Sequence, residues 1–154
     1  MNNSYEQAVL DAACHVFETS AFLTVLPHEV GPDLPQPDSC ATMTFKGPVE
    51  GRVSMRIASE VLDTIVENLL EMQTDPEEQA RRRNDVLKEM LNMLCGNVLT
   101  MHFGSNPVFN LSPPEVLGNG ELPAPTSADV HRIVLNVENT LAEVLFEVQN
   151  QKNS

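Results

Sequence analysis

Basic residues are scarce in this sequence. Nine Lys and Arg stand against 22 Asp and Glu among 154 residues, which gives a formal net charge of −13. Proteins that bind nucleic acid draw much of their affinity from Lys and Arg contacts to phosphate, so this balance argues against a nucleic-acid partner. It equally disfavours docking on an anionic membrane surface. We therefore expect no nucleic acid and no membrane among the partners.

Long apolar runs and paired cysteines are also missing. No stretch approaches the ~20 apolar residues of a membrane-spanning helix. The first ten residues contain no Lys or Arg, whereas a signal peptide begins with a basic segment. Cys14, Cys40 and Cys95 lie far apart and form no Cys-x-x-Cys pair. Three widely spaced cysteines are typical of reduced thiols in a cytosolic protein. We therefore expect a cytoplasmic protein.

Common catalytic signatures are absent too. The four histidines show no metal-ligand spacing, and the sequence holds neither a Gly-x-Ser-x-Gly motif nor a Gly-rich phosphate loop. We therefore expect no metal and no cofactor bound by the chain itself. Any catalysis has to come from another arrangement of residues.

The apolar pattern is that of one globular domain over residues 1–154, because 42% of the residues are hydrophobic and only 20% are charged. Helical spacing of apolar residues predicts helices over 4–17, 59–72 and 76–103, the last between an N-cap at Asp75 and Gly104. Alternation and β-branched content predict strands over 21–30, 41–47, 49–58, 108–111 and 131–137. Residues 140–148 suit a central strand as well as a helix, and we favour a final hairpin through Glu138 and Asn139. The expected fold is an α/β (α+β) sandwich, with helices packed on a largely antiparallel sheet.

One helix carries a polar stripe on an otherwise apolar background. Asp85, Glu89, Asn92 and Gly96 stand at offsets 0, 4, 7 and 11. At 100° per residue they fall within roughly 60° of one another around the helix. The solvated face of an amphipathic helix also carries such residues, so the stripe alone does not establish a function.

Two members of the stripe favour a functional interpretation. Asn is a poor residue for a helix interior, and Gly96 costs about 1 kcal/mol relative to Ala. A missing side chain beside polar groups suits the close approach of another surface. Glu89 and Asn92, three residues apart, lie on one face and can reach a single target together.

The stripe resembles a motif of the CheC/CheX/FliY group of chemotaxis phosphatases. The pattern in that group is an Asp or Ser, three residues, Glu, two residues, Asn, and a Pro downstream after a strand. Asp85, Glu89 and Asn92 match it, and Pro113-Pro114 follow the strand expected near 108–111. The order of elements over about residues 4–148 is similar to that of CheX. CheC-type members carry two Glu-x-x-Asn motifs, so the single motif here resembles CheX more closely.

The resemblance implies a phosphatase of two-component signalling. Its substrate would be the aspartyl phosphate of a CheY-like response-regulator receiver domain, which itself supplies Mg²⁺ and a Lys. Positioning is then the main task of the phosphatase. Asn92 would orient the attacking water, because an amide both donates and accepts hydrogen bonds. Glu89 would pair with the receiver Lys, and Asp85 and Gly96 would serve partner docking. CheX-like proteins are homodimers, so a homodimer is expected.

A non-catalytic alternative uses the same helix. In this alternative the protein is a dimeric adaptor that binds a receiver domain or a flagellar-switch component. The intact pair Glu89 and Asn92 favours the enzyme, since an adaptor has no need for both. The basic run 81–83 also has two interpretations: pairing with Glu77 and Glu78 across helical turns, or docking an acidic rim of the partner.

Overall fold

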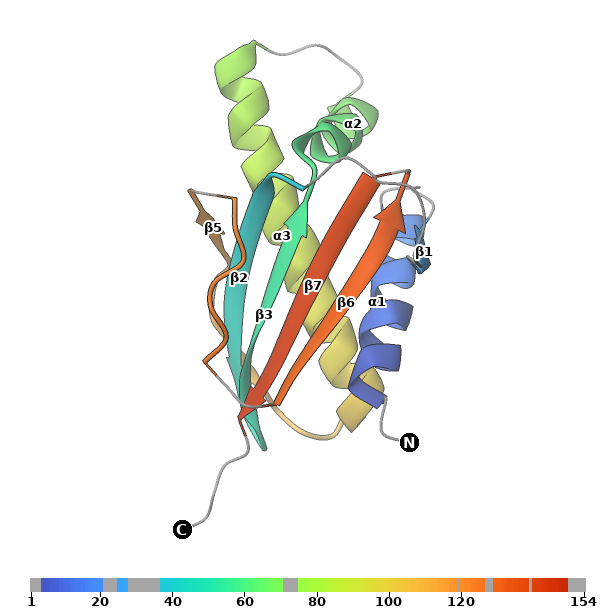
Figure 1. The fold of residues 1–154 in the computed structure, drawn as a ribbon, viewed down its shortest axis with the longest axis vertical. Helices are drawn as coiled ribbons and strands as arrows, with labels where there is room; N and C mark the ends of the chain where they lie inside the picture. The colour runs from blue at the N-terminus through green and yellow to red at the C-terminus, as the bar shows by residue number, and fades with distance from the viewer. Residues whose placement is uncertain are drawn as a thin grey trace.

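In the described part of the chain, a seven-stranded antiparallel sheet forms one of the two layers of the molecule (Figure 1). The structure, a computed structural model, describes residues 4–20, 25–27, 37–70, 75–118, 120–126, 129–138 and 140–149. The strands are β1 (Val25–Pro27), β2 (Ser39–Lys46), β3 (Glu50–Ile57), β4 (Asn110–Leu111), β5 (Glu115–Leu117), β6 (Asp129–Val137) and β7 (Thr140–Gln149). Their order is β1-β6-β7-β3-β2-β4, and β5 also pairs with β2. The expected antiparallel sheet is confirmed.

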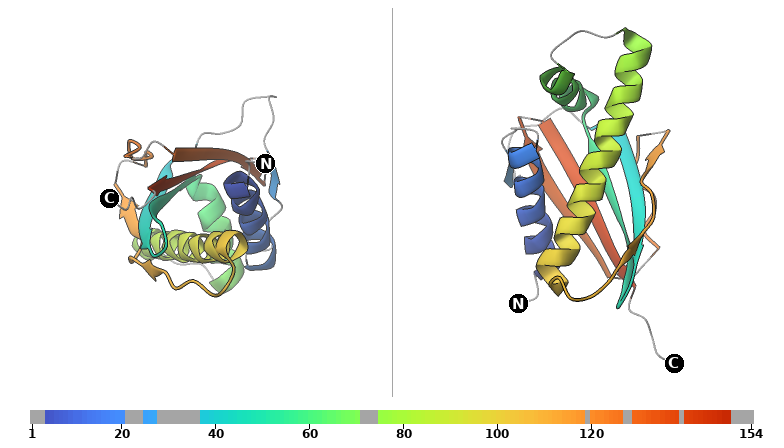
Figure 2. Two further views of the ribbon diagram at one scale, coloured as in Figure 1. Left: turned by 90° about the horizontal axis from the view of Figure 1, so that it is seen from below. Right: turned by 180° about the vertical axis from the view of Figure 1, so that it is seen from behind.

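Three helices complete the fold of the described residues: α1 (Ser4–Ser20), α2 (Ser59–Leu70) and α3 (Pro76–Phe103). Seen from behind and from below, α1 and α3 lie side by side across one face of the sheet, and α2 sits beyond the end of the strands next to the start of α3 (Figure 2). The core fills the space between these two layers. It joins Val9, Val16 and Phe17 of α1, Leu87, Leu91 and Leu94 of α3, and Met43, Met55, Val144 and Phe146 of the sheet.

The 28-residue helix α3 is bounded by the caps that its sequence predicts. The Asp75 side chain accepts a hydrogen bond from the Glu78 N–H at 2.8 Å, and Pro76 occupies the first turn, where its missing N–H has no cost. At the other end Gly104 adopts φ +83°, which favours glycine, and its N–H donates to the Thr100 carbonyl. The helix continues without a break through the arginines. One rigid element therefore carries the whole polar stripe.

The final hairpin β6–β7 is confirmed, with Glu138 at φ +51° in its turn. The central strand β7 is buried at every position from Ala142 to Val148. Its inner face packs on the helices, and its outer face carries the buried carboxylates Glu143 and Glu147. Burial on both faces explains why this segment shows no clean alternation in sequence.

Ion pairs hold residues 120–126 across the outer face of the sheet. Arg52 donates to Glu147 and to the Ala124 carbonyl, while Arg56 donates to Glu143 and to the Gly120 carbonyl. Glu147 also accepts the N–H of Thr126 at 2.8 Å. These contacts satisfy buried carboxylates that would otherwise be costly.

Two strand predictions extend beyond the strands observed. The strand near 108–111 comprises only Asn110–Leu111, because only these residues pair with β2, and Val108 before them is 79% exposed. Of the strand predicted over 21–30, β1 covers Val25–Pro27, and the rest lies outside the described residues.

Candidate active site

The polar stripe of α3 forms one wall of an open groove. Asp85, Lys88, Glu89 and Asn92 line one side, and residues 111–114 line the other; the volume is about 380 Å³. Seen from behind, the chain that leaves α3 turns back and runs along the outer edge of β2 (Figure 2). The groove therefore joins a helix with a segment that follows it in sequence.

Sheet pairing fixes the second wall. Leu111 of β4 pairs with Phe45 of β2, and Val116 of β5 pairs with Ala41 of β2. Both short strands therefore lie on the same edge of β2. Between them Ser112 is held at both polar groups: its N–H donates to the Thr44 carbonyl at 2.9 Å, and its Oγ accepts the Thr44 N–H at 2.8 Å. Residues 113 and 114 follow as two prolines, which cannot donate to the ladder and occupy the interruption between the strands.

Three stripe residues leave their polar groups available to another molecule. Asp85, Glu89 and Asn92 are exposed, and no hydrogen bond or ion pair involves their side chains within the described part of the chain. Asn97, one turn further along, differs: its amide donates to the Met93 carbonyl at 2.8 Å. The helix thus uses one asparagine for its own backbone and leaves the Asn92 amide free for an external partner.

Gly96 lies at the same side of α3 but outside this groove. Leu111 borders both spaces, and the neighbouring hollow, of about 200 Å³, is lined by Gly96 together with Leu99, Thr100, Gly104, Ser105, Pro107 and Phe109. Apart from its own helical turn, a Cβ built on Gly96 would meet no heavy atom of the described residues within 4 Å. Packing within the chain therefore does not require glycine at this position.

Sequence reasoning missed three residues of the groove, Lys88, Leu111 and Ser112. Lys88 stands three residues after Asp85 and directly before Glu89, so its spacing was a usable signal. Leu111, 38% exposed, carried no such signal, because its place depends on the pairing of β4 with β2.

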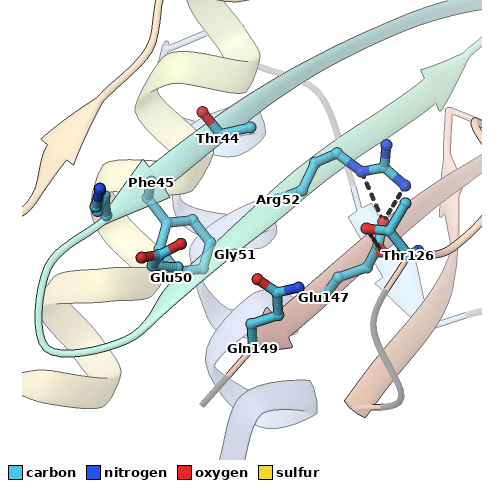
Figure 3. A pocket seen from close by; sticks show the side chains of 9 residues that line it. Thr44, Phe45, Glu50, Gly51, Arg52, Thr126, Glu147 and Gln149 are labelled. Carbon is cyan, nitrogen blue, oxygen red and sulfur yellow. Dashed lines mark hydrogen bonds and ion pairs between the residues drawn. The ribbon is translucent and has the colours of Figure 1, made fainter. Parts of the chain in front are cut away.

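A second pocket of about 380 Å³ opens at the end of the sheet, between β2, β3 and β7 (Figure 3). Its buried carboxylate already has partners: the Glu147 side chain points toward Arg52 and Thr126, and an ion pair of 2.6 Å joins it to Arg52. This pocket is therefore an opening beside a structural ion pair.

Among the described residues, the thiols and histidines form no alternative centre. Burial raises the pKa of Cys95 to about 12 and that of Cys40 to about 11, so neither is a ready nucleophile. Among residues whose placement is described, no cluster of His, Cys, Asp and Glu could hold a metal ion. None of the described helices is long and apolar enough to cross a bilayer.

Comparison with protein families gives a match that spans both walls of the groove. The model of the chemotaxis phosphatase CheX matches residues 39–138. The chain belongs to the CheX family. The CheX match includes α3, β4 and β5, and so contains every residue that lines the groove.

Solved CheX structures share the fold over nearly the whole chain. CheX from Desulfovibrio desulfuricans is 17% identical with a TM-score of 0.76, covering 94% of this chain and 99% of its own. CheX from Vibrio vulnificus is 18% identical with a TM-score of 0.75, covering 94% and 96%. The CheX–CheY–BeF₃–Mg²⁺ complex from Borrelia burgdorferi matches at 19% identity and a TM-score of 0.69, covering 94% and 97%. No curated protein sequence matches the chain.

Proposed function

We propose that this protein hydrolyses the aspartyl phosphate of a CheY-like receiver domain, with Asn92 orienting the attacking water. The observation that carries the proposal is the groove itself. Glu89 and Asn92 share one exposed wall, and their side chains have no partner among the described residues. The chain belongs to a family of chemotaxis phosphatases, and a relative with the same fold has been crystallised with CheY.

The residue types suit hydrolysis of an acyl phosphate. Water attacks phosphorus in line with the leaving carboxylate, the bond between phosphorus and the aspartyl oxygen breaks, and inorganic phosphate and a free Asp result. The amide of Asn92 holds the water by donating or accepting a hydrogen bond, and adds no negative charge beside the phosphoryl group. Mg²⁺ belongs to the receiver, and the phosphatase contributes no cofactor of its own.

Glu89 has a different role in this proposal. A carboxylate aimed at the phosphoryl group would be repelled, but one helical turn away it can pair with the receiver Lys and anchor the insertion of Asn92. Asp85, four residues before Glu89, lines the same groove and helps to dock the receiver. Of the two catalytic residues, Asn92 thus acts on the reacting water and Glu89 on the partner.

Release of inorganic phosphate from a phosphorylated receiver tests the proposal. Candidate substrates are the purified receiver domains of the source organism, each phosphorylated with a small-molecule phosphodonor. Asn92→Ala is expected to lower the acceleration about 10²-fold, the usual loss for a group that orients a reacting water. Two controls lie at exposed helical positions outside the groove: Asn68→Ala removes an amide like that of Asn92, and Glu77→Ala removes a carboxylate like that of Glu89. Both should leave the rate of phosphate release unchanged. Equal rates for Asn92→Ala and wild type would refute the mechanism.

The adaptor alternative gives a separate result in the same experiment. An adaptor binds a phosphorylated receiver without accelerating phosphate release, and the rate of release is then the same with wild type and with Asn92→Ala. We also propose the homodimer that the resemblance to CheX implies. Sedimentation equilibrium decides this point, with a mass near twice the 17.0 kDa of one chain expected.

A further inference from the structure

Positive charge is concentrated in one short segment of this acidic protein. Four of the nine Lys and Arg residues fall within 81–88, in a chain of net charge −13. Three others, Arg52, Arg56 and Arg132, are committed to ion pairs with the buried carboxylates Glu143 and Glu147. The segment 81–88 is therefore the main cationic surface offered by the described residues.

The basic side chains frame a hollow of about 380 Å³. Arg81, Arg82 and Lys88 line it, with Glu78, Asn84 and Asp85 between them. The Arg81 side chain is 70% exposed and that of Arg82 48%, and both guanidinium groups share the single carboxylate of Glu78 at 3.9 and 3.1 Å. Three cations thus face two carboxylates, so the hollow carries net positive charge.

Arg83 has another role and does not belong to this surface. Its Nε donates to Asp63 of α2 at 2.8 Å in a half-buried contact, and Gln79 donates to the same oxygen. These bonds hold α2 against α3. The prediction that the run pairs with Glu77 and Glu78 is right only for Arg81 and Arg82, which pair with Glu78, whereas Arg83 pairs across helices.

The basic hollow is continuous with the candidate active site. Asp85 and Lys88 line both spaces. Glu89 stands eight positions after Arg81, which is about 12 Å along a helix. A partner seated over Asn92 therefore extends over Arg81 and Arg82 if its contact surface has the usual width of a protein interface.

We propose that Arg81, Arg82 and Lys88 dock an acidic rim of the receiver domain whose aspartyl phosphate enters the neighbouring groove. The proposal rests on the function proposed above. A site that holds Mg²⁺ and a phosphoryl group is built largely from oxygen ligands, carboxylates among them, so the surface of the substrate at this point is anionic. The net negative charge of this protein opposes its approach to an anionic surface. The basic hollow makes the electrostatic interaction attractive locally, beside the reacting groups.

The rate of association with a receiver loaded with beryllium fluoride and Mg²⁺ tests this proposal without requiring turnover. The probes are the purified receiver domains of the source organism, mixed with the phosphatase by stopped flow. Arg81→Ala should slow association about 3-fold, and Arg81→Ala/Arg82→Ala about 10-fold, at low ionic strength. Both effects should disappear at ~0.5 M NaCl, where exposed charges are screened.

Lys46→Ala is the matched control, because it removes one positive charge from the exposed end of β2, away from the start of α3 (Figure 1). It should leave association unchanged, and all variants should unfold at the wild-type temperature. The double variant should retain the wild-type maximal rate of phosphate release at saturating receiver, because Arg81 and Arg82 of the wild type do not touch the reacting groups.

The outcomes separate this proposal from the proposed function. Binding that weakens in the double variant, with no phosphate release by wild type, supports the docking surface and refutes the enzyme. Normal phosphate release with equal association rates for wild type and the double variant refutes the docking surface and leaves the enzyme standing. If Lys46→Ala slows association as much as Arg81→Ala does, net charge controls the association rate and local docking is refuted. Absence of binding to every loaded receiver refutes both proposals.

Discussion

Asn92 of α3 and Pro113 of the β4–β5 connection line the same groove from opposite sides. Their meeting depends on the end of α3 at Gly104, the return of the chain, and the hydrogen bonds that fix Ser112 to Thr44. The backbone that carries each residue is held in place, that of Asn92 by a long packed helix and that of Pro113 by the paired strands on either side of it. The groove is therefore preorganised for a partner, which reduces the entropy lost on binding.

Separate roles for Asn92 and Glu89 predict a separation of kinetic parameters. Asn92→Ala should lower kcat about 10²-fold with little change in KM, because the amide acts on water in the transition state. Glu89→Ala should mainly raise KM, because it removes an anchor for the receiver. Steady-state phosphate release over a range of receiver concentrations measures both. A change confined to KM in Asn92→Ala would make Asn92 a docking residue.

Gly96→Ala should raise stability and lower affinity together. A Cβ at this position meets no heavy atom within 4 Å, so the variant gains about 0.5–1 kcal/mol from the lower helix propensity of glycine. The same methyl group occupies space that the docked receiver is predicted to approach. Urea unfolding and receiver binding are the two measurements. Gly118→Ala, whose Cβ also meets no atom, is a control outside α3. Higher stability with unchanged affinity would remove Gly96 from the docking surface.

Glu143 should make stability depend on pH. Burial alone raises the pKa of this carboxyl, but hydrogen bonds from Arg132 and Arg56 outweigh burial and bring the pKa below its ordinary value of 4.5. A lowered folded-state pKa stabilises the fold above pH 4.5, and this contribution is lost as pH falls through the folded value. The difference in free energy of unfolding between wild type and Glu143→Gln should therefore be largest near neutral pH and narrow below pH 4.5.

Urea titrations from pH 3 to pH 7 measure that difference. Glu77→Gln, at an exposed position in the first turn of α3, is the control and should follow the wild-type curve closely. A gap between wild type and Glu143→Gln that stays constant over this range would mean that the arginines do not lower the pKa of Glu143.

The three thiols should differ in reactivity. Cys40 and Cys95 are buried, with pKa values raised to about 11 and about 12, whereas Cys14 is partly exposed and its pKa is raised by burial and by Glu18 and Asp11. A disulfide reagent at pH 8 should label one thiol in the folded protein and all three in urea. Cys14→Ser should abolish labelling of the folded form. Rapid labelling of a second thiol would contradict the burial of the core cysteines.

Local signals were sufficient for the main elements. Asp75, Pro76 and Gly104 bound α3 as predicted, because capping and positive φ are properties of a few adjacent residues. Alternation located the β2–β3 hairpin, since one face of each strand is buried. Where both faces are buried, as in β7, alternation disappears and the sequence alone admitted a helix as well.

The candidate site was only partly determined by sequence. Helical periodicity alone placed Asp85, Glu89 and Asn92 on one exposed side of α3, because they belong to one rigid helix. Tertiary structure decided what faces them: pairing of β4 and β5 with β2 brings residues 111–114 across the groove and leaves Gly96 in the next hollow. It also separated Arg83, bound to Asp63, from Arg81 and Arg82 at the surface. Spacing along one helix is set by bonds between near neighbours, whereas contacts between distant segments depend on how the whole sheet and its helices pack.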